Sequence, residues 1–346
     1  MEAVYVDPKG DPTQAVQLAT QLAQQDNVDI LTGAVLSSEC TAVQALAPQF
    51  GIVYLASSGC ATDTFSTQTC NRYSFRLTPG GKQLIDAATQ AEVKLFGKNW
   101  GIIYADYAFG QSQMQATQAA VQQAGGNLPI KIAVPLGEPN VTPYVTQVPT
   151  DGSIQALVVS QVGADLARTM AVLQQFGMDK KLGIITTTGK ENYAGVYPDV
   201  VNGSIITGIH VSSPAPDNTW DQDYNTAFHA MATGKDASFI GPLGGASNLT
   251  TGTVNSYTPY AAMTALKLAM RSSNFTGKAD TDNLIAALEN LNVKQGPDFP
   301  AGDVIMNKAD HQGRTTVYLL KVDGQKEDVV QTIPADQMPL IGNCQV

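Results

Sequence analysis

The order of hydrophobic and polar positions along the chain predicts alternating strands and helices. Short runs rich in β-branched and aromatic residues predict strands at residues 3–6, 28–31, 52–56, 100–104, 130–134, 156–160, 182–186 and 204–210. Between them, apolar residues recur at helical spacing and predict amphipathic helices at residues 12–25, 41–50, 82–96, 112–124 and 163–176. This alternation is typical of α/β folds with parallel sheets.

The alternation ends after residue 210. A segment rich in Pro and Ser leads into three successive predicted helices, near residues 221–231, 258–271 and 281–291. The rest of the chain predicts a strand at 303–306 and a β-hairpin over 316–333, whose turn Asp323-Gly324 suits a tight connection. Because 346 residues exceed what one hydrophobic core usually supports, we expect two domains.

Charge and composition narrow the classes of function. Thirty acidic residues against 20 basic ones give a net charge of -10, which is unfavourable for binding nucleic acid or anionic lipid. No run of 18 apolar residues predicts a membrane span. The three histidines, His210, His229 and His311, are far apart and lack the spacing of metal ligands. We therefore expect neither an enzyme nor a metal or cofactor site.

Four cysteines, Cys40, Cys60, Cys70 and Cys344, offer a disulfide framework without any C-x-x-C motif. Cys60 and Cys70 bracket a short polar segment of a size that a disulfide can close, so we expect this pair. Cys40 and Cys344 would then pair by elimination. An even count fits an oxidising compartment, and free buried thiols are the alternative in a chain of this length.

Several segments, taken in order, resemble one known family. They are VDPKGDPTQAVQLATQLAQQDNVDILTGAVLSSE, GIVYLASSGCATD, NRYSFRLTPG, WGIIYADYAFGQS and KADHQGRTTVYLLKV. In order and spacing they resemble the type I periplasmic binding proteins of the leucine/isoleucine/valine kind, the solute receptors of ABC importers. The resemblance covers nearly the whole chain.

The resemblance implies an α/β fold of two Rossmann-like lobes with parallel central sheets, joined by a three-strand hinge near residues 76–78, 210–212 and 313–315. Residues 1–77 with 212–314 would form lobe 1, and residues 78–211 with 315–346 would form lobe 2. A small molecule would bind between the lobes and be buried by hinge closure.

The resemblance also implies a monomeric receptor in the periplasm or anchored at the cell surface, which delivers its ligand to the permease subunits of an ABC transporter. A ligand-sensing domain of a signalling system is the alternative, because the same fold serves both roles.

In lobe 1 the resemblance places ligand contacts in two segments. Ser37 and Ser38 follow the strand at 28–31, where hydroxyl and backbone N–H groups suit a carboxylate. Plain N-capping of the next helix is the alternative for these serines. Ser58, Ala61 and Thr62 lie in the segment that binds the ligand's acid group in the family, although a gap-free alignment puts Gly59-Cys60 at the place of Ala61-Thr62.

In lobe 2 the resemblance points to Tyr107, Phe109 and Thr187. Phe109 occupies the position of an aromatic residue that commonly packs against bound ligand, and packing within its own lobe is the alternative. Thr187 ends a strand and is expected to face the cleft. Amino-acid receptors place an acidic residue near this point, which this chain lacks.

The lack of an acidic residue near Thr187 bears on which class of ligand the protein binds. An ammonium group taken out of water without a partner costs free energy, so an amino-acid receptor needs a carboxylate in its cleft. The candidates are Glu191, Asp63, Asp106 and Asp165. We expect a ligand that carries a carboxylate, either a branched-chain amino acid or an aromatic acid.

Members of the resembled family have a strand and a long helix before the segment that matches residues 3–6. We therefore expect a chain that lacks this first strand and helix. A gap in lobe 1 between the strands at 3–6 and 52–56, or a strand borrowed from elsewhere, and weak ligand binding would follow.

Overall fold

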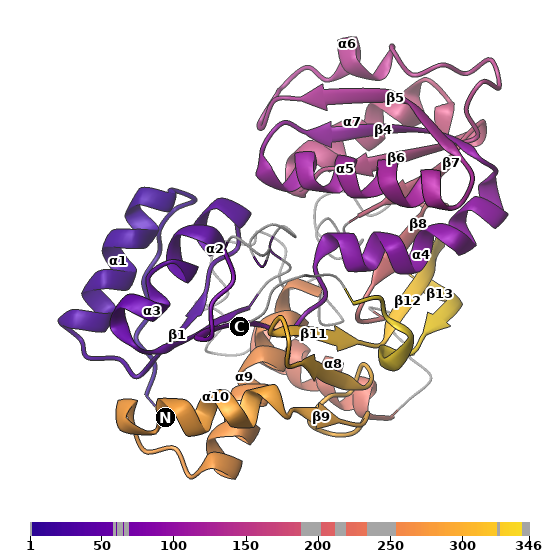
Figure 1. The fold of residues 1–346 in the computed structure, drawn as a ribbon. Coiled ribbons are helices and arrows are strands. Elements are labelled where there is room, and N and C mark those ends of the chain that lie inside the picture. The colour runs from indigo at the N-terminus through magenta and orange to yellow at the C-terminus, as the bar shows by residue number, and fades with distance from the viewer. Residues whose placement is uncertain are drawn as a thin grey trace.

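The computed structural model describes residues 2–57, 60, 65, 69–187, 202–211, 219–233, 254–323 and 326–340. These residues form a two-sheet α/β fold, with one lobe around each sheet (Figure 1). The expected fold class is therefore confirmed. Within these ranges, no helix combines the length and the apolar character needed to cross a membrane.

The sheet of lobe 1 is mostly parallel. Among the described residues its strands lie in the spatial order β1 (Ile30–Gly33), β2 (Val53–Ala56), β3 (Ser74–Arg76), β11 (Gln312–Thr315), β10 (Val304–Asn307) and β9 (Asn292–Val293). The strands from β1 to β11 pair in parallel, whereas β10 pairs antiparallel with both of its neighbours.

Helices cover both faces of this first sheet, as a strand buried on both sides requires. Alternate residues of β2 point to opposite faces: Tyr54 joins one core cluster, and Val53 and Leu55 join another. The helices on the Tyr54 face are α1 (Pro12–Gln24), α2 (Ser37–Gln44) and α3 (Ala47–Phe50). On the other face lie α9 (Val254–Ser273) and α10 (Thr281–Glu289), and α8 (Thr219–Thr233) precedes them in the chain.

The sheet of lobe 2 has a parallel centre and an antiparallel edge. Among the described residues its order is β13 (Lys326–Ile333), β12 (Val317–Asp323), β8 (Ile205–Gly208), β7 (Gly183–Thr186), β6 (Ala156–Ser160), β4 (Asn99–Ala105) and β5 (Asn127–Val134). The strands from β8 to β5 pair in parallel, and β12 pairs antiparallel with both β8 and β13. The predicted hairpin is thereby confirmed.

Two helical layers also enclose the second sheet. Trp100 and Val158 pack beneath α4 (Gly81–Phe96) and α5 (Ala108–Gln123), whereas Ile103 and Val159 pack against α7 (Gly163–Gln175) on the opposite face. The short helix α6 (Thr142–Val145) lies on the α7 side. Short 3₁₀ helices are η2 (Met178–Lys180), η6 (Lys278–Asp280) and η7 (Ala335–Gln337).

The chain passes between the two sheets at three places: after β3, after β8, and between β11 and β12. The first and third of these crossings lie side by side, because β3 pairs with β11. His311, just before β11, stacks on Phe75 of β3 with ring centroids 3.9 Å apart. Crossing strands packed in this way are the elements about which two lobes can rotate.

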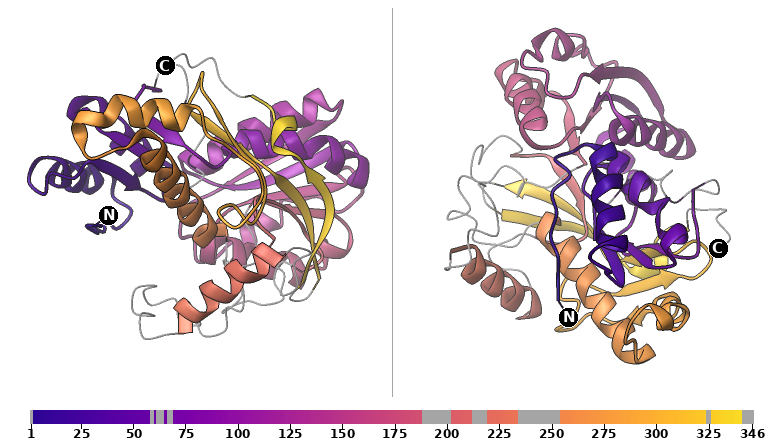
Figure 2. Two further views of the ribbon diagram at one scale, coloured as in Figure 1. Left: turned by 90° about the horizontal axis from the view of Figure 1, so that it is seen from below. Right: turned by 90° about the vertical axis from the view of Figure 1, so that its left-hand side faces the viewer.

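The expected strand at residues 3–6 is wrong. Val4, Tyr5 and Val6 are 51%, 72% and 39% exposed and form no strand, and in Figure 2 this segment runs outside the sheets. Alternation favours a strand only where another strand offers its backbone for pairing, and within the described chain β1 pairs only with β2. The strands of lobe 1 that the structure describes are hydrogen-bonded neighbours throughout, so the expected gap does not separate them.

Candidate ligand-binding site

The candidate residues that the structure describes follow the carboxyl ends of strands in both lobes. Ser37 and Ser38 come after β1, Tyr107 and Phe109 after β4, and Thr187 directly after β7. Helix α2, which begins with the serines, contacts helix α5, which begins beside the aromatic pair. Ligands of open α/β sheets bind at this kind of edge. Ser58, Ala61 and Thr62 lie outside the described residues.

The two serines are the first residues of α2, which starts four residues earlier than the sequence predicts. The N-cap is Leu36 rather than a serine. Glu39 stabilises this helix start, because its Oε2 accepts hydrogen bonds from the backbone N–H groups of Leu36 (3.1 Å) and Val35 (3.3 Å). Ser37 is buried and Ser38 is half-buried. The first turn of a helix has N–H groups without intrahelical partners, which suits an anion.

A disulfide joins Cys40 of α2 to Cys60, with the two Cα atoms 6.3 Å apart. The expected pairing of Cys60 with Cys70 is therefore wrong, and Cys70 is itself disulfide-bonded. Sequence spacing reports only the size of a closed loop, whereas packing of α2 over β2 brings Cys40 and Cys60 into one core with Phe65. The bond ties α2 to the β2–β3 segment (residues 57–73), which contains three of the candidate ligand residues.

The aromatic pair stands at the start of α5, four residues before the predicted beginning of that helix. Tyr107 is the N-cap and Phe109 lies in the first turn. Both side chains are half-buried, and their ring centroids are 6.0 Å apart with planes tilted by 32°. Burial, with a smaller contribution from the negative charge of Asp165, raises the pKa of Tyr107 to about 12. Tyr107 therefore presents a neutral hydroxyl beside an apolar ring.

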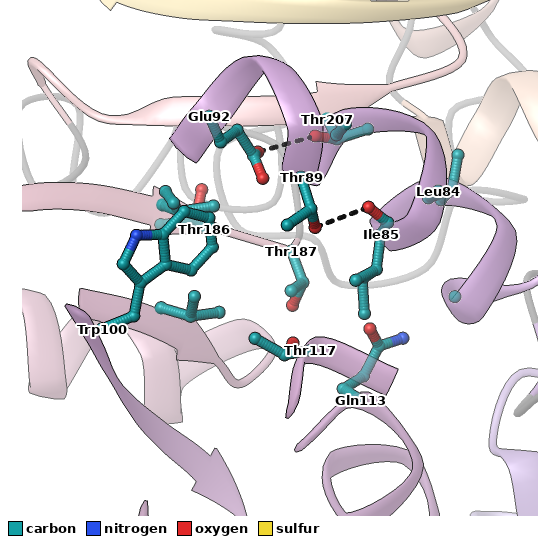
Figure 3. Close-up of a pocket in the computed structure, with 14 residues that line it drawn as sticks. Leu84, Ile85, Thr89, Glu92, Trp100, Gln113, Thr117, Thr186, Thr187 and Thr207 are labelled. Carbon is teal, nitrogen blue, oxygen red and sulfur yellow. Dashed lines mark hydrogen bonds between the residues drawn. The ribbon is translucent and has the colours of Figure 1, made fainter. Parts of the chain in front are cut away.

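Thr187, which directly follows β7, lines a cavity inside lobe 2. Its Oγ1 donates to Ser160 Oγ at the end of β6 over 3.4 Å. The cavity, of about 40 Å³, lies between α4, α5 and the sheet, and Thr187 lines it (Figure 3). In Figure 3, Glu92 and Thr207 lie at one end of it and Gln113 and Thr117 at the other. A space of this size, lined by both polar and apolar side chains, holds about one or two water molecules rather than an organic ligand.

Comparison with known proteins decides the family. The family profile described as periplasmic binding protein matches residues 1–327. This chain belongs to the periplasmic binding protein family. Among curated proteins, none matches it.

Solved structures with the same fold include several binding proteins of ABC transporters. An ABC transporter substrate-binding protein from Sphaerobacter thermophilus has a TM-score of 0.82 at 21% identity, covering 97% of this chain and 88% of its own. A solute-binding protein from R. palustris, in complex with benzoate, has a TM-score of 0.79 at 18% identity, covering 99% and 87%. A branched-chain amino acid binding protein from Burkholderia xenovorans has a TM-score of 0.76 at 18% identity, covering 96% and 84%.

In this periplasmic binding protein, the described carboxylates that the sequence offers as partners for an ammonium group already have partners of their own. Asp165 pairs with Arg168 and accepts a 2.9 Å hydrogen bond from the backbone N–H of Gly137. Asp106 is exposed and accepts a 3.0 Å hydrogen bond from Gln111 Nε2. Asp63 and Glu191 lie outside the described residues. Among the residues that the structure does describe, no three His, Cys, Asp or Glu side chains gather in a metal-binding group.

Proposed function

We propose that this periplasmic binding protein is the receptor of an ABC importer and binds a small aromatic carboxylate between its lobes. The observation that carries the proposal is the contact between α2, which begins at Ser37, and α5, which begins directly after Tyr107. We also propose the lobe bounds that the sequence predicts, 1–77 with 212–314 and 78–211 with 315–346. The distribution of strands between the two sheets supports them.

Each half of such a ligand has a matching surface. A carboxylate is favoured by the positive end of the α2 helix dipole and would accept a hydrogen bond from the hydroxyl of Ser38. A benzene ring is favoured by the offset rings of Tyr107 and Phe109, because tilted aromatic pairs at this separation attract one another. Thr187 would contact the ligand from the end of β7, and Ser58, Ala61 and Thr62 from the β2–β3 segment.

An aromatic acid fits these surroundings better than a branched-chain amino acid. An amino acid brings an ammonium group, and Asp165 is already neutralised by Arg168 within lobe 2. The structural neighbour from R. palustris holds benzoate, and another from the same species holds 4-hydroxybenzoate, which supports the same ligand class here.

The ligand would pass from this receptor to permease subunits, outside the cytoplasm and with the receptor acting as a monomer. Membership of a family of extracytoplasmic receptors supports this placement. Stimulation of a reconstituted transporter's ATPase by the ligand-loaded protein would test the partner.

The ligand is tested by calorimetry and thermal denaturation with benzoate, its neutral isostere benzamide, leucine and glucose. Benzoate at about 100 times its Kd should stabilise the protein by roughly 2.7 kcal/mol, and benzamide should bind far more weakly because it lacks the charge. Binding of leucine in preference to benzoate would replace the aromatic ligand by an amino acid. Tight binding of glucose with no response to either acid would overturn the proposal.

A further inference from the structure

Arg76 is a fully buried cation at the point where the chain first leaves lobe 1. It is the last residue of β3, and its side chain is 0% exposed. Burying a guanidinium group is costly unless its N–H groups are satisfied and its charge is compensated. The partners of Arg76 therefore show what the residue does.

Two of these partners belong to the β2–β3 segment. Arg76 Nη1 donates a 2.7 Å hydrogen bond to the backbone carbonyl oxygen of Cys60. The guanidinium carbon lies 4.9 Å from the ring centroid of Phe65, within the range of a cation–π contact. Cys60 is also the residue that the disulfide ties to α2. Arg76 thus contacts the β2–β3 segment at two described residues, Cys60 and Phe65.

A third partner comes from the third crossing. Gln312 of β11 is the residue that pairs with Arg76 in the sheet. Arg76 Nη2 donates to Gln312 Oε1, and Gln312 Nε2 in turn donates to the carbonyl oxygen of Phe65 over 3.4 Å. The side chain of Gln312 therefore links Arg76 to the carbonyl oxygen of Phe65 in the β2–β3 segment. Gln312 itself lies on β11, which is a hinge strand.

A fourth contact comes from lobe 2. Gly80 is the N-cap of α4, the first helix of that lobe, and its backbone lies against the guanidinium group. A Cβ atom on residue 80 would stand only 2.3 Å from Arg76 Nη2. Gly80 has φ -69° and ψ 160°, a conformation that alanine adopts without strain, so only this contact demands glycine.

We infer that Arg76 is a positioning residue that couples the β2–β3 segment of lobe 1 to the angle between the lobes. When α4 moves relative to lobe 1, Gly80 moves against the guanidinium group, which is bonded to Cys60 and stacked on Phe65. A change in the conformation of the β2–β3 segment and closure of the lobes would then be thermodynamically coupled, so that each favours the other. A planar guanidinium group can make these contacts at once, whereas the single ammonium group of lysine cannot.

This inference rests on the proposed function for its consequence in ligand binding, but its structural part can be measured without any ligand. The test uses hydrogen–deuterium exchange of the β2–β3 segment in the ligand-free protein, together with calorimetry against benzoate. The variants are G80A, R76K, R76M and the double variant R76M/G80A. G296A is the matched control, because a Cβ on residue 296 meets nothing closer than 3.8 Å.

G80A should increase exchange in the β2–β3 segment by about tenfold and weaken benzoate binding by a similar factor, while the core strands of lobe 2 exchange as before. R76K should have the same effect although it keeps the charge. In the R76M background the added methyl group finds room, so G80A should then change nothing further. G296A should behave as the unsubstituted protein.

Two results would overturn the inference. One is that the β2–β3 segment exchanges at the same rate in G80A and in R76K as it does in G296A. The other is that G80A changes this exchange rate equally when residue 76 is arginine and when it is methionine. Gly80 would then have a merely structural role. If neither benzoate nor any other acid binds, the proposed function fails, while the exchange data still decide whether Arg76 positions the segment. If R76M does not fold, the comparison of G80A, R76K and G296A still decides it.

Discussion

Glu92 of α4 accepts a 3.3 Å hydrogen bond from Thr207 Oγ1 of β8 at one end of the cavity of lobe 2 (Figure 3). Glu92 is 3% exposed, and among the described residues that line the cavity it is the only carboxylate. Burial raises the pKa of Glu92 to about 7, and the hydrogen bond from Thr207 opposes this rise only in part. The folded protein therefore holds a proton on Glu92 at pH values where the unfolded chain has released it.

This proton makes the free energy of unfolding depend on pH. The folded pKa of about 7 lies above the ordinary value of 4.5, so the stabilisation is fully present below pH 4.5 and is lost as the pH rises to about 7. The whole change is about 3 kcal/mol. E92Q, which keeps the shape and carries no charge, should remove this dependence and be the more stable protein at pH 8.

Urea unfolding of both proteins at pH 5.5 and pH 8 measures the effect. The difference between them isolates Glu92 from His311, whose pKa burial lowers and which therefore destabilises the fold as the pH falls below about 6.5. Equal pH dependence of E92Q and the unsubstituted protein would contradict the assignment.

The second prediction concerns the Cys40–Cys60 disulfide. Peptide mapping of the oxidised protein under acidic, non-reducing conditions should yield a Cys40–Cys60 cross-link. Replacing both residues by alanine should reduce the free energy of unfolding by about 3 kcal/mol, because the bond closes a loop of about 20 residues. Recovery of a Cys60–Cys70 peptide instead would restore the pairing that sequence spacing suggests.

The sequence predicts central parallel strands such as β2 and β6 well, because each is an apolar run buried on both faces. Residues 156–160 coincide with β6, and the hairpin at 316–333 contains β12 and β13. No local pattern predicts β3 and β11, and only the family resemblance places hinge strands close to them, near residues 76–78 and 313–315. Both strands are short and carry Arg76 and Gln312, whose polar side chains are buried by contact with each other. Residues 3–6 fail for the converse reason, since a suitable pattern there has no pairing partner in the described chain.

The candidate site was predictable at the level of segments and less so in detail. The starts of α2 and α5 are both missed by four residues, because Leu36 and Tyr107 at their N-caps are not typical capping residues. Glu39, three residues after Leu36, is the signal that could have placed the start of α2. The Asp165–Arg168 pair is likewise readable, as opposite charges three residues apart on a helix.

Close contact between the first and third crossings gives a third prediction. Gly313 of β11 packs directly on the backbone of residue 77, and a Cβ at position 313 would lie 1.8 Å from the carbonyl oxygen of Leu77. Rigid backbone cannot yield as a side chain can, so G313A should force β3 and β11 apart. We expect a loss of about 1–3 kcal/mol in the free energy of unfolding, measured with urea. G296A serves again as control, and equal stability of the two variants would show that the crossings do not touch.

Phe109 provides the last prediction, which separates binding from folding. Its ring is half-buried and meets Tyr107 at 6.0 Å, so a bound benzene ring would complete a cluster of three rings. F109A should weaken benzoate binding by up to about tenfold, the worth of one aromatic contact, and leave the melting temperature of the ligand-free protein nearly unchanged. F176A is the matched control, because Phe176 is 46% exposed at the end of α7.

Calorimetry with benzoate and cyclohexanecarboxylate completes this test. Both acids carry the same charge, but only benzoate offers a π face, so the loss caused by F109A should be larger for benzoate. A loss of equal size for the two acids would reduce the role of Phe109 to filling space. A fall in the melting temperature of ligand-free F109A, with affinity unchanged, would instead assign the ring to the core of its own lobe.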